Sequence, residues 1–473
     1  MEAKEALDKI LKPESVAVVG ASTDPFKWGH MLLAAIQQGG FEGDLYPINP
    51  NAAEILGLRC YPRLTDIPGK LDMALIVVPA RIVPSIFKDA AEKGVKGAVV
   101  ITSGFSETGE EGRKLIEEIK SYAGGNTRFI GPNCMGVTSS ESKLSALMIP
   151  FLHERGDVAF ISQSGGYGLQ LYLRASAMGV GIGKFISSGN ESDLKGWEYL
   201  KYFGEDPDTK LICMYIEGLK NGRKWYEEAR SISPKKPIVV IKVGVTEIGS
   251  KAAASHTGSI AGSDRVYDAA FKQAGVIRAK DASEMFDFTK GLLYCDLPEG
   301  PNIGIISNSG GIAIETADSL IQNSLVVPTL GEEAQEEILN VIPDFGNPRN
   351  PVDLTATLDM NSFLKVPDIV LKQPEINGLV TISLGTSIIK TMFPDVDDED
   401  LKGMYQWING QLIDTYKKYD KPVIAIDPSA DVAGESATQL EKEGIPVYTT
   451  PERAADVMGV LWRRKKFLDR IKE

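Results

Sequence analysis

Two residues of this 473-residue chain could take part in acid–base or nucleophilic chemistry. His256 lies in A-A-A-S-H-T-G-S-I-A-G-S-D, and this run of small residues predicts a mobile loop rather than a packed element. An imidazole in such a loop could act as a base, a ligand or a nucleophile. Glu217 ends an apolar run in Y-I-E-G, where a carboxylate could orient an imidazole or stabilise an imidazolium. An ordinary surface histidine and an ordinary loop glutamate are the alternatives.

Two similar hexapeptides form a second set of candidates. I-S-Q-S-G-G at 161–166 and I-S-N-S-G-G at 306–311 each follow an apolar run and precede an amphipathic stretch. Each predicts a strand that turns directly into a helix, where free N–H groups and the helix dipole bind anions. A serine N-cap without a ligand is the alternative, and the match indicates that the second and third parts of the chain are copies of one fold. The candidate phosphate-binding residues are Gln163, Ser164, Gly165, Gly166, Asn308, Ser309, Gly310 and Gly311.

The first part of the chain has the turns of a nucleotide-binding fold but not those of a dehydrogenase. Gly20 follows the apolar run 16–19, yet the rest of G-x-G-x-x-G is absent, and the next run ends at Asn49 rather than at an acidic residue. Ligands of open parallel sheets bind outside the carboxyl ends of the strands. Several ligand-like turns at predicted strand ends therefore indicate a nucleotide-like cofactor, although any one of them could be an ordinary connection. They are V-V-P-A at 77–80, T-S-G-F-S-E at 102–107 and G-P-N-C-M-G at 131–136.

Short β-branched runs alternate with longer amphipathic stretches along the whole chain. This alternation predicts βαβ units, parallel sheets and an α/β fold. Breaks near 122–128 and 297–302 divide the chain into expected domains 1–127, 128–297 and 298–473. The expected strands are 16–19, 73–78, 98–101, 158–161, 211–216, 238–241, 303–306, 379–384 and 422–426.

Composition excludes several classes of protein. Lys and Arg number 51 and Asp and Glu number 64, which gives a net charge of −13 and no basic stripe for nucleic acid or anionic membrane surfaces. The four cysteines never form C-x-x-C, and His256 has no Cys or His at ligand spacing, so neither a disulfide framework nor a metal site is expected. No apolar stretch is long enough to span a bilayer, and a reduced, cytoplasmic setting is expected.

Taken together, the motifs resemble those of the NDP-forming acyl-CoA synthetase superfamily, over nearly the whole chain. The nearest likeness is to the α subunit of ADP-forming acetyl-CoA synthetase, and succinyl-CoA synthetase is a more distant relative. The most specific marker is K-V-G at 242–244 followed by S-H-T-G-S-I-A-G-S-D. The resemblance implies an N-terminal Rossmann-like CoA-binding domain followed by two flavodoxin-like domains of the succinyl-CoA synthetase type. All three domains would be doubly wound.

The resemblance also implies roles for individual residues. His256 would be phosphorylated, Glu217 would steady the phosphohistidine, and the two hexapeptides would hold the transferred phosphate. Residues in the strand-end turns of the first domain would bind CoA. These residues are Gly20, Ala21, Ser22, Val78, Pro79, Ser103, Gly104 and Asn133.

The reaction implied is acetyl-CoA + ADP + phosphate ⇌ acetate + ATP + CoA, through acetyl phosphate and phosphorylated His256. No ATP-grasp module is recognisable in the sequence. The resemblance therefore implies that a separate ATP-grasp β subunit binds Mg-ADP or Mg-ATP, in an α2β2 heterotetramer. The alternatives are a CoA-binding regulatory protein or acyltransferase scaffold without synthetase activity, and a Rossmann oxidoreductase. The sequence does not select the acyl group, nor ADP over GDP.

Overall fold

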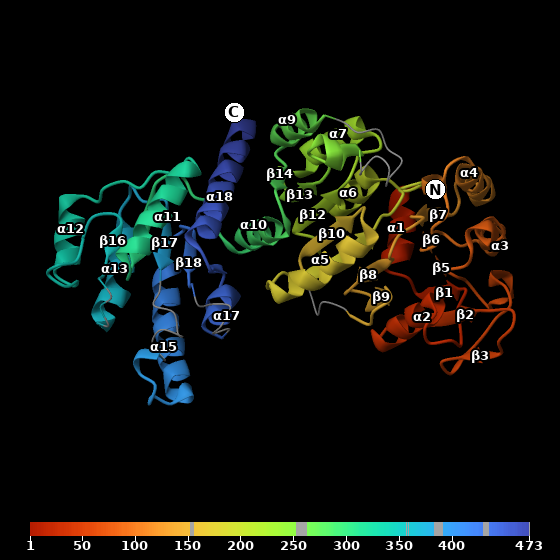
Figure 1. The fold of residues 1–473 in the computed structure, drawn as a ribbon, viewed down its shortest axis with the longest axis horizontal. Coiled ribbons are helices and arrows are strands. Elements are labelled where there is room, and N and C mark those ends of the chain that lie inside the picture. The colour runs from red at the N-terminus through yellow and green to blue at the C-terminus, as the bar shows by residue number, and fades with distance from the viewer. Residues whose placement is uncertain are drawn as a thin grey trace. The chain divides into compact units, whose positions relative to one another are not determined.

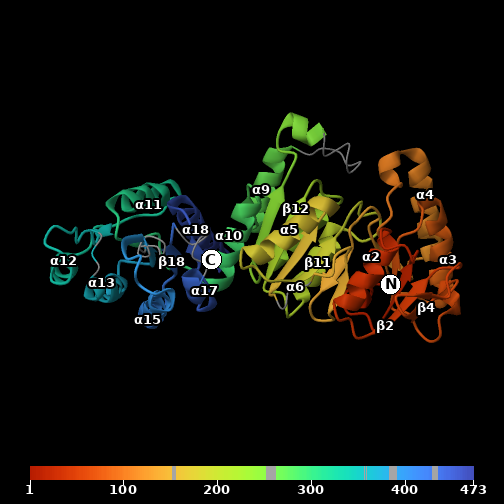
Figure 2. The ribbon, with the colours of Figure 1, turned by 60° about the horizontal axis from the view of Figure 1, so that its bottom comes forward.

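The computed structural model describes residues 1–151, 156–251, 263–355, 357, 359–382, 391–428 and 435–472. It divides into two compact units, Met1–Phe286 and Asp287–Glu473. Figures 1 and 2 show the ribbon from two directions. The first unit contains a five-stranded and a seven-stranded sheet, and the second unit contains another five-stranded sheet. No helix within the described ranges is both long enough and apolar enough to cross a membrane.

The first sheet is parallel and has the order β2-β1-β5-β6-β7. Its strands are β1 (Ser15–Val19), β2 (Asp44–Ile48), β5 (Met73–Ile76), β6 (Gly97–Val100) and β7 (Arg128–Ile130). A small hairpin of β3 (Glu54–Ile55) and β4 (Leu58–Arg59) follows β2. The helices are α1 (Ala3–Leu11), α2 (Trp28–Gln38), α3 (Val83–Lys93) and α4 (Glu110–Ala123).

Both faces of the first sheet are covered, and its strands β1, β5 and β6 are buried along their whole length. Successive side chains of a strand point to opposite faces. Val16 and Val18 of β1 therefore pack in the core that contains α1 and α2. Ala17 and Val19 pack in the core that contains α3 and α4. Both views show α3 and α4 on the opposite side of this sheet from α2.

The second sheet has the order β14-β13-β12-β10-β11-β8-β9. Five strands are parallel, and β8 and β9 extend the sheet in antiparallel pairing beside β11. Its strands are β8 (Val137–Ser139), β9 (Leu144–Ala146), β10 (Val158–Ser162), β11 (Ile182–Ser187), β12 (Leu211–Ile216), β13 (Ile238–Lys242) and β14 (Ile277–Ala279). The helices are α5 (Gly165–Ala177), α6 (Gly196–Glu205), α7 (Gly222–Ile232), α9 (Asp264–Ala274) and α10 (Ala282–Tyr294). One hydrophobic core runs from the α1 and α2 face of the first sheet into this sheet.

The sheet of the second unit is parallel, with the order β16-β15-β17-β18-β19. Its strands are β15 (Ile303–Ser307), β16 (Val352–Asp353), β17 (Gly378–Ile382), β18 (Val423–Ile426) and β19 (Val447–Tyr448). The helices are α11 (Gly310–Gln322), α12 (Glu332–Leu339), α13 (Met360–Lys372), α15 (Asp398–Tyr416), α17 (Glu435–Lys442) and α18 (Pro451–Lys472).

The parallel strands of all three sheets share one order. Numbered along the chain within each sheet, they run 2-1-3-4-5 in every case, with the antiparallel β8 and β9 left out of the second sheet. This order is typical of flavodoxin-like doubly wound folds. It confirms the expected α/β class. In the second and third sheets, the repeated hexapeptide lies at the end of the strand numbered 1 and at the start of the helix that follows it.

The strand pairing bears on the expected domain boundaries. β7 lies just beyond the first expected boundary, yet it pairs with β6 in the first sheet. The A-G-G-N-T stretch is instead the end of α4, where Gly124 caps the helix at φ +54°. Near the second expected boundary, the division of the chain into the two compact units falls within α10. The division into three domains stays a prediction.

Candidate functional site

The predicted ligand-binding turns of the first unit meet at the switch points of its two sheets. A switch point is the place where the chain reverses its direction of sheet growth, and ligands of such folds bind there. In the first sheet it lies between β1 and β5, which lead into Gly20 and into Val77. In the second sheet it lies between β10 and β12, which lead into Gln163 and Glu217.

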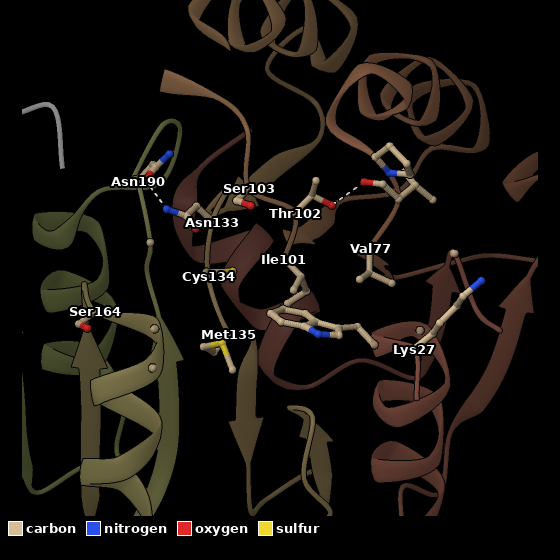
Figure 3. A pocket seen from close by; sticks show the side chains of 18 of the residues that line it. Lys27, Val77, Ile101, Thr102, Ser103, Asn133, Cys134, Met135, Ser164 and Asn190 are labelled. Carbon is tan, nitrogen blue, oxygen red and sulfur yellow. Dashed lines mark hydrogen bonds between the residues drawn. The ribbon is translucent and has the colours of Figure 1, made fainter. Parts of the chain in front are cut away.

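Turns from both sheets line one cavity of about 570 Å³ (Figure 3). The structure thus brings together predicted residues of two kinds. From the predicted CoA set the cavity is lined by Gly20, Val78, Pro79, Ser103 and Asn133. From the predicted phosphate set it is lined by Gln163, Ser164, Gly165 and Gly166. Ala21, Ser22 and Gly104 belong to the same turns but do not line it.

The Gly20 turn is closely packed against the start of α2. Gly20 has φ +96°, and a Cβ on Gly29 would lie 1.9 Å from the Gly20 carbonyl oxygen. Hydrogen bonds hold the following residues: the Asn49 side chain donates to the Ala21 carbonyl at 2.8 Å, and His30 Nδ1 lies 2.9 Å from the Ser22 carbonyl. Two glycines are therefore needed for the helix N-terminus to approach this turn.

The S-G-F-S-E turn is organised by its own carboxylate. Glu107 accepts hydrogen bonds from the backbone N–H of Gly104 at 2.6 Å and of Phe105 at 3.1 Å, and from the Asn190 side chain at 2.5 Å. Burial alone would raise the pKa of Glu107, but these hydrogen bonds outweigh it and lower the pKa. An ionised Glu107 thus connects the first sheet to the loop after β11.

The N-terminus of α5 opens at the other side of the cavity. Ser164 is the N-cap, and its side chain caps no backbone N–H. The Ser162 hydroxyl instead donates to the Ser164 carbonyl at 2.7 Å. A Cβ on Gly165 would lie 2.7 Å from Met135 Cγ, whereas one on Gly166 would meet nothing within 4 Å. The first N–H groups of a helix lack intrahelical partners, so this end can bind an anion.

The side chain of Gln163, unlike those of its neighbours in the predicted phosphate set, is hydrogen-bonded to the turn at Glu217. Its Oε1 accepts from the backbone N–H of Glu217 at 2.7 Å and of Gly218 at 3.0 Å. Its Nε2 donates to Glu191 Oε1 at 3.0 Å and to the Gly218 carbonyl at 2.7 Å. Both amide protons and the amide oxygen are therefore used within the protein. The side chain positions the Glu217 turn. The backbone N–H of Gln163 donates to the Tyr215 carbonyl at 3.1 Å, so every N–H group of Gln163 already has a partner within the protein.

Of the two predicted catalytic residues, the structure describes Glu217 but not His256. Glu217 is half-buried at the end of β12, directly held by Gln163. Burial, and to a smaller extent the negative charge of Glu217, raises the pKa of the neighbouring Tyr215 to about 12. His256 lies outside the described residues. Its role remains a prediction.

Sequence reasoning missed several residues that line the cavity. Lys27 and Trp28 come from the start of α2, and Asn190 comes from the loop after β11. Figure 3 shows Lys27 on the side of the first sheet and Asn190 beside Asn133, to which it is hydrogen-bonded at 3.3 Å. Among the described residues that line the cavity, Lys27 is the one with a charged side chain at neutral pH. Lys27 and Trp28 lie at the start of a helix rather than directly after a strand, so the pattern of strand-end turns does not reveal them.

Cys134 also lines the cavity but is a poor nucleophile. Its side chain is buried, and its Sγ donates to the Val100 carbonyl at 3.3 Å. Burial raises the pKa of the Cys134 thiol to about 12. Thiolate is the reactive form, so Cys134 would contribute volume and packing rather than chemistry.

The second hexapeptide differs from the first in its surroundings. Asn308 is buried, and neither its amide nitrogen nor its amide oxygen has a hydrogen-bond partner in the part of the chain that the structure describes. At the start of α11, a Cβ on Gly310 would lie 3.0 Å from Asp353 Oδ2. A carboxylate thus already lies near this helix N-terminus, where it is favoured by the dipole. Phosphate binding by Asn308, Ser309, Gly310 and Gly311 stays a prediction.

Three family models match the chain in succession. They are a CoA binding domain at residues 14–140, a succinyl-CoA ligase like flavodoxin domain at 155–292 and a ligase-CoA domain at 303–471. The first match spans the first sheet, the second spans β10 to β14 of the second sheet, and the third spans the sheet of the second unit.

Individual relatives match over nearly the whole chain. The chain is 37% identical to the acetate–CoA ligase (ADP-forming) I subunit alpha of Pyrococcus furiosus, with 99% of this chain and 100% of that one covered. It is 34% identical to the acetate–CoA ligase (ADP-forming) II of Archaeoglobus fulgidus, with 97% of this chain and 67% of that one covered. Among solved structures, acetyl-coenzyme A synthetase 1 of Ca. Korarchaeum cryptofilum, in complex with phosphate and ADP, is similar with a TM-score of 0.87. That match has 35% identity and covers 99% of this chain and 98% of the other. The chain therefore belongs to the family of ADP-forming acetate–CoA ligases, as a homologue of their alpha subunits.

Proposed function

We propose that this chain is the CoA-binding and phosphohistidine-carrying α subunit of an ADP-forming acetate–CoA ligase. The reaction is acetyl-CoA + ADP + phosphate ⇌ acetate + ATP + CoA. The observation that carries the proposal is the shared cavity: predicted CoA residues such as Gly20 and Ser103 face it together with the α5 N-terminus at Ser164. A thioester and a phosphate bound there would be neighbours.

The first chemical step needs little besides positioning. A phosphate oxygen attacks the thioester carbonyl carbon, a C–O bond forms, the C–S bond breaks, and CoA leaves as its thiol after taking up a proton. The products are acetyl phosphate and CoA. Free N–H groups at Gly165 and Gly166 would hold the phosphate. Backbone N–H groups can bind a phosphate in this way even in a protein whose net charge is −13.

The second step would transfer the phosphoryl group to His256. The imidazole attacks phosphorus, a P–N bond forms, the P–O bond to the acetyl group breaks, and acetate leaves. Glu217 would stabilise the positive charge that the imidazole gains. ADP then takes the phosphoryl group, and the P–N bond breaks to give ATP. Phosphoryl transfer depends mainly on such positioning and charge stabilisation.

The nucleotide would be bound by a partner, an ATP-grasp β subunit in an α2β2 heterotetramer. The chain covers 100% of a relative that is named a subunit alpha but only 67% of a longer relative that carries no subunit name. The name of the first relative implies a partner subunit, which supports a separate polypeptide for Mg-ADP and Mg-ATP. The assembly would work in the cytoplasm, where its four free cysteines stay reduced.

The proposal is tested by assaying ATP formation from acetyl-CoA, ADP and phosphate. The chain is assayed alone, and then with the ATP-grasp protein encoded nearest to its gene. We expect activity in the mixture and none from the chain alone. Activity of the chain alone would contradict the partner proposal. CoA binding without ATP formation in any mixture would favour a regulatory or acyltransferase protein.

A further inference from the structure

We propose that Glu191 and Gln163 form a positioning pair that fixes the Glu217 turn at the phosphate end of the cavity. The inference rests on the proposed function, because it assigns residues to the step in which acetyl phosphate gives up its phosphoryl group. Neither side chain would touch the reacting atoms. Both would act through the position of Glu217.

The contact between the pair is one link of a continuous chain of hydrogen bonds. Gln163 Nε2 donates to Glu191 Oε1 at 3.0 Å, and Gln163 Oε1 accepts from the Glu217 N–H at 2.7 Å. Gln163 lines the cavity at the end of β10, so the pair joins the cavity wall to the carboxylate-bearing turn after β12. The amide oxygen and both amide N–H groups of Gln163 have hydrogen-bond partners, which favours a single orientation of the side chain.

Glu191 is held as firmly as the amide that it orients. It is 2% exposed, and its carboxylate also accepts from the Ser188 hydroxyl at 3.0 Å and from the Gly196 N–H at the start of α6 at 3.1 Å. Its backbone has φ +46°, a conformation that a residue with a Cβ seldom adopts without support from its surroundings. Lys195 gives that support by donating to the Glu191 carbonyl at 2.5 Å.

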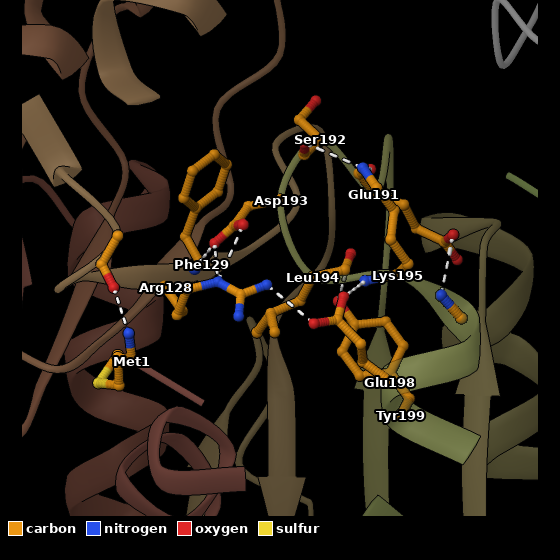
Figure 4. A network of polar contacts seen from close by, with 12 residues as sticks. Met1, Arg128, Phe129, Glu191, Ser192, Asp193, Leu194, Lys195, Glu198 and Tyr199 are labelled. Carbon is orange, nitrogen blue, oxygen red and sulfur yellow. Dashed lines mark hydrogen bonds and ion pairs between the residues drawn. The ribbon is translucent and has the colours of Figure 1, made fainter. Parts of the chain in front are cut away.

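The Glu191 loop is in turn fixed to the first sheet. Figure 4 shows the segment from Glu191 to Glu198, with Arg128 of β7 reaching Asp193 and Glu198. The Arg128 guanidinium lies 2.9 Å from both carboxylates. At the cavity, Asn190 donates to Glu107 of the S-G-F-S-E turn. The positioning pair therefore connects the predicted CoA-binding turns to Glu217 through one polar network.

The pair can be tested by exchanging the amide of Gln163 and the carboxylate of Glu191. Glu191→Gln puts an amide N–H₂ where Glu191 accepts hydrogen bonds, and Gln163→Glu sets two carboxylates against each other. The double variant restores an amide-to-carboxylate hydrogen bond in the reverse direction. Each protein is assembled with its partner, and two single-turnover rates are measured: label transfer to the chain from acetyl phosphate and label transfer from ATP.

We expect each single variant to slow transfer from acetyl phosphate by about tenfold or more, as for the loss of a hydrogen bond to a charged group. Transfer from ATP and the KM for CoA should stay near wild type. The double variant should be faster than either single variant, although the Gly218 carbonyl loses the donor that Gln163 supplies. Asp206→Asn is the matched control: it removes a buried carboxylate that pairs with Lys184 of β11 rather than with Gln163 or Glu191. It should lower thermal stability and leave both transfer rates unchanged.

The outcomes separate this inference from the proposed function. Single variants that transfer label from acetyl phosphate at the wild-type rate would overturn the positioning pair. So would a double variant that is no faster than the single variants, or an Asp206→Asn protein that is slowed as much as Glu191→Gln. A wild-type assembly that takes no label from acetyl phosphate would instead contradict the proposed function.

Discussion

The side-chain oxygen of Gln163 accepts a hydrogen bond from the backbone N–H of Glu217 at 2.7 Å. Gln163 follows β10 and Glu217 follows β12, so this bond joins the two strands on either side of the switch point of the second sheet. The glutamine thereby fixes how far the Glu217 turn stands from the N-terminus of α5. A carboxylate held at a fixed distance from this helix N-terminus could stabilise the imidazole of His256, if that imidazole attacks a phosphate bound there.

Glu217→Gln should slow phosphoryl transfer while leaving CoA binding intact. The substitution keeps the shape of the side chain and removes the negative charge that would stabilise an imidazolium. We expect transfer from acetyl phosphate to slow by about tenfold or more, as for the loss of a charge-assisted contact. Single-turnover labelling of the assembled enzyme measures the rate, and calorimetry with CoA is the control. Transfer at the wild-type rate would refute the role of Glu217.

Gly29→Ala should weaken both CoA binding and stability. The new Cβ would lie 1.9 Å from the Gly20 carbonyl oxygen, so α2 must move away from the Gly20 turn. We expect a loss of about 1–3 kcal/mol in the free energy of unfolding, typical of overpacking, and a rise in the Kd for CoA. Gly222→Ala is the control, since a Cβ at the first residue of α7 meets nothing within 4 Å. Equal CoA affinities for the two variants would contradict this account.

Lys27→Gln should raise the KM for CoA. Lys27 supplies the positive charge among the described residues of the cavity lining, and CoA carries several phosphate charges. Loss of one charge-assisted contact should raise KM by about tenfold. The wild-type KM should rise with ionic strength more steeply than that of the variant. Lys88→Gln, on an exposed site of α3, is the matched control. If both variants change KM alike, Lys27 does not contact CoA.

Lys195 should make stability depend on pH in the alkaline range. Burial, with repulsion from Lys220 and Lys120, lowers the pKa of Lys195 from its usual 10.5 to about 8. Between these two values the unfolded chain holds a proton that the folded chain has released, so this contribution to stability rises with pH. The rise is at most about 1.4 kcal/mol per pH unit. Denaturant unfolding of wild type and Lys195→Met from pH 7.5 to 10.5 measures the difference, and parallel curves would contradict the assignment.

The fold was largely predictable because most strands are continuous apolar runs. β1, β12 and β15 match the expected ranges to within a residue. β11 was missed because I-G-K-F-I-S contains a glycine and a lysine. Lys184 is nonetheless buried, since its ammonium pairs with Asp206 at 2.8 Å, a partner 22 residues away that local sequence does not reveal.

The site was also only partly predictable, because contacts between residues far apart in the sequence help to form it. Turns after predicted strands gave most of the cavity, whereas Asn190 was missed together with β11, the strand that precedes it. Glycine and serine content indicated phosphate binding at both hexapeptides. It could not indicate that Gln163 is used inside the protein while Asn308 has no partner among the described residues. That difference arises from the strands and loops packed around each turn.

The most direct test of the central claim is the location of a labelled phosphoryl group. The assembled enzyme is incubated with γ-labelled ATP, and the denatured chain is digested under alkaline conditions that preserve phosphohistidine. We expect one acid-labile, alkali-stable label on the peptide that contains His256, and its loss on addition of acetate and CoA. His256→Ala should carry no label. Label on another residue, or undiminished label in His256→Ala, would contradict the assignment of this chain as the phosphohistidine carrier.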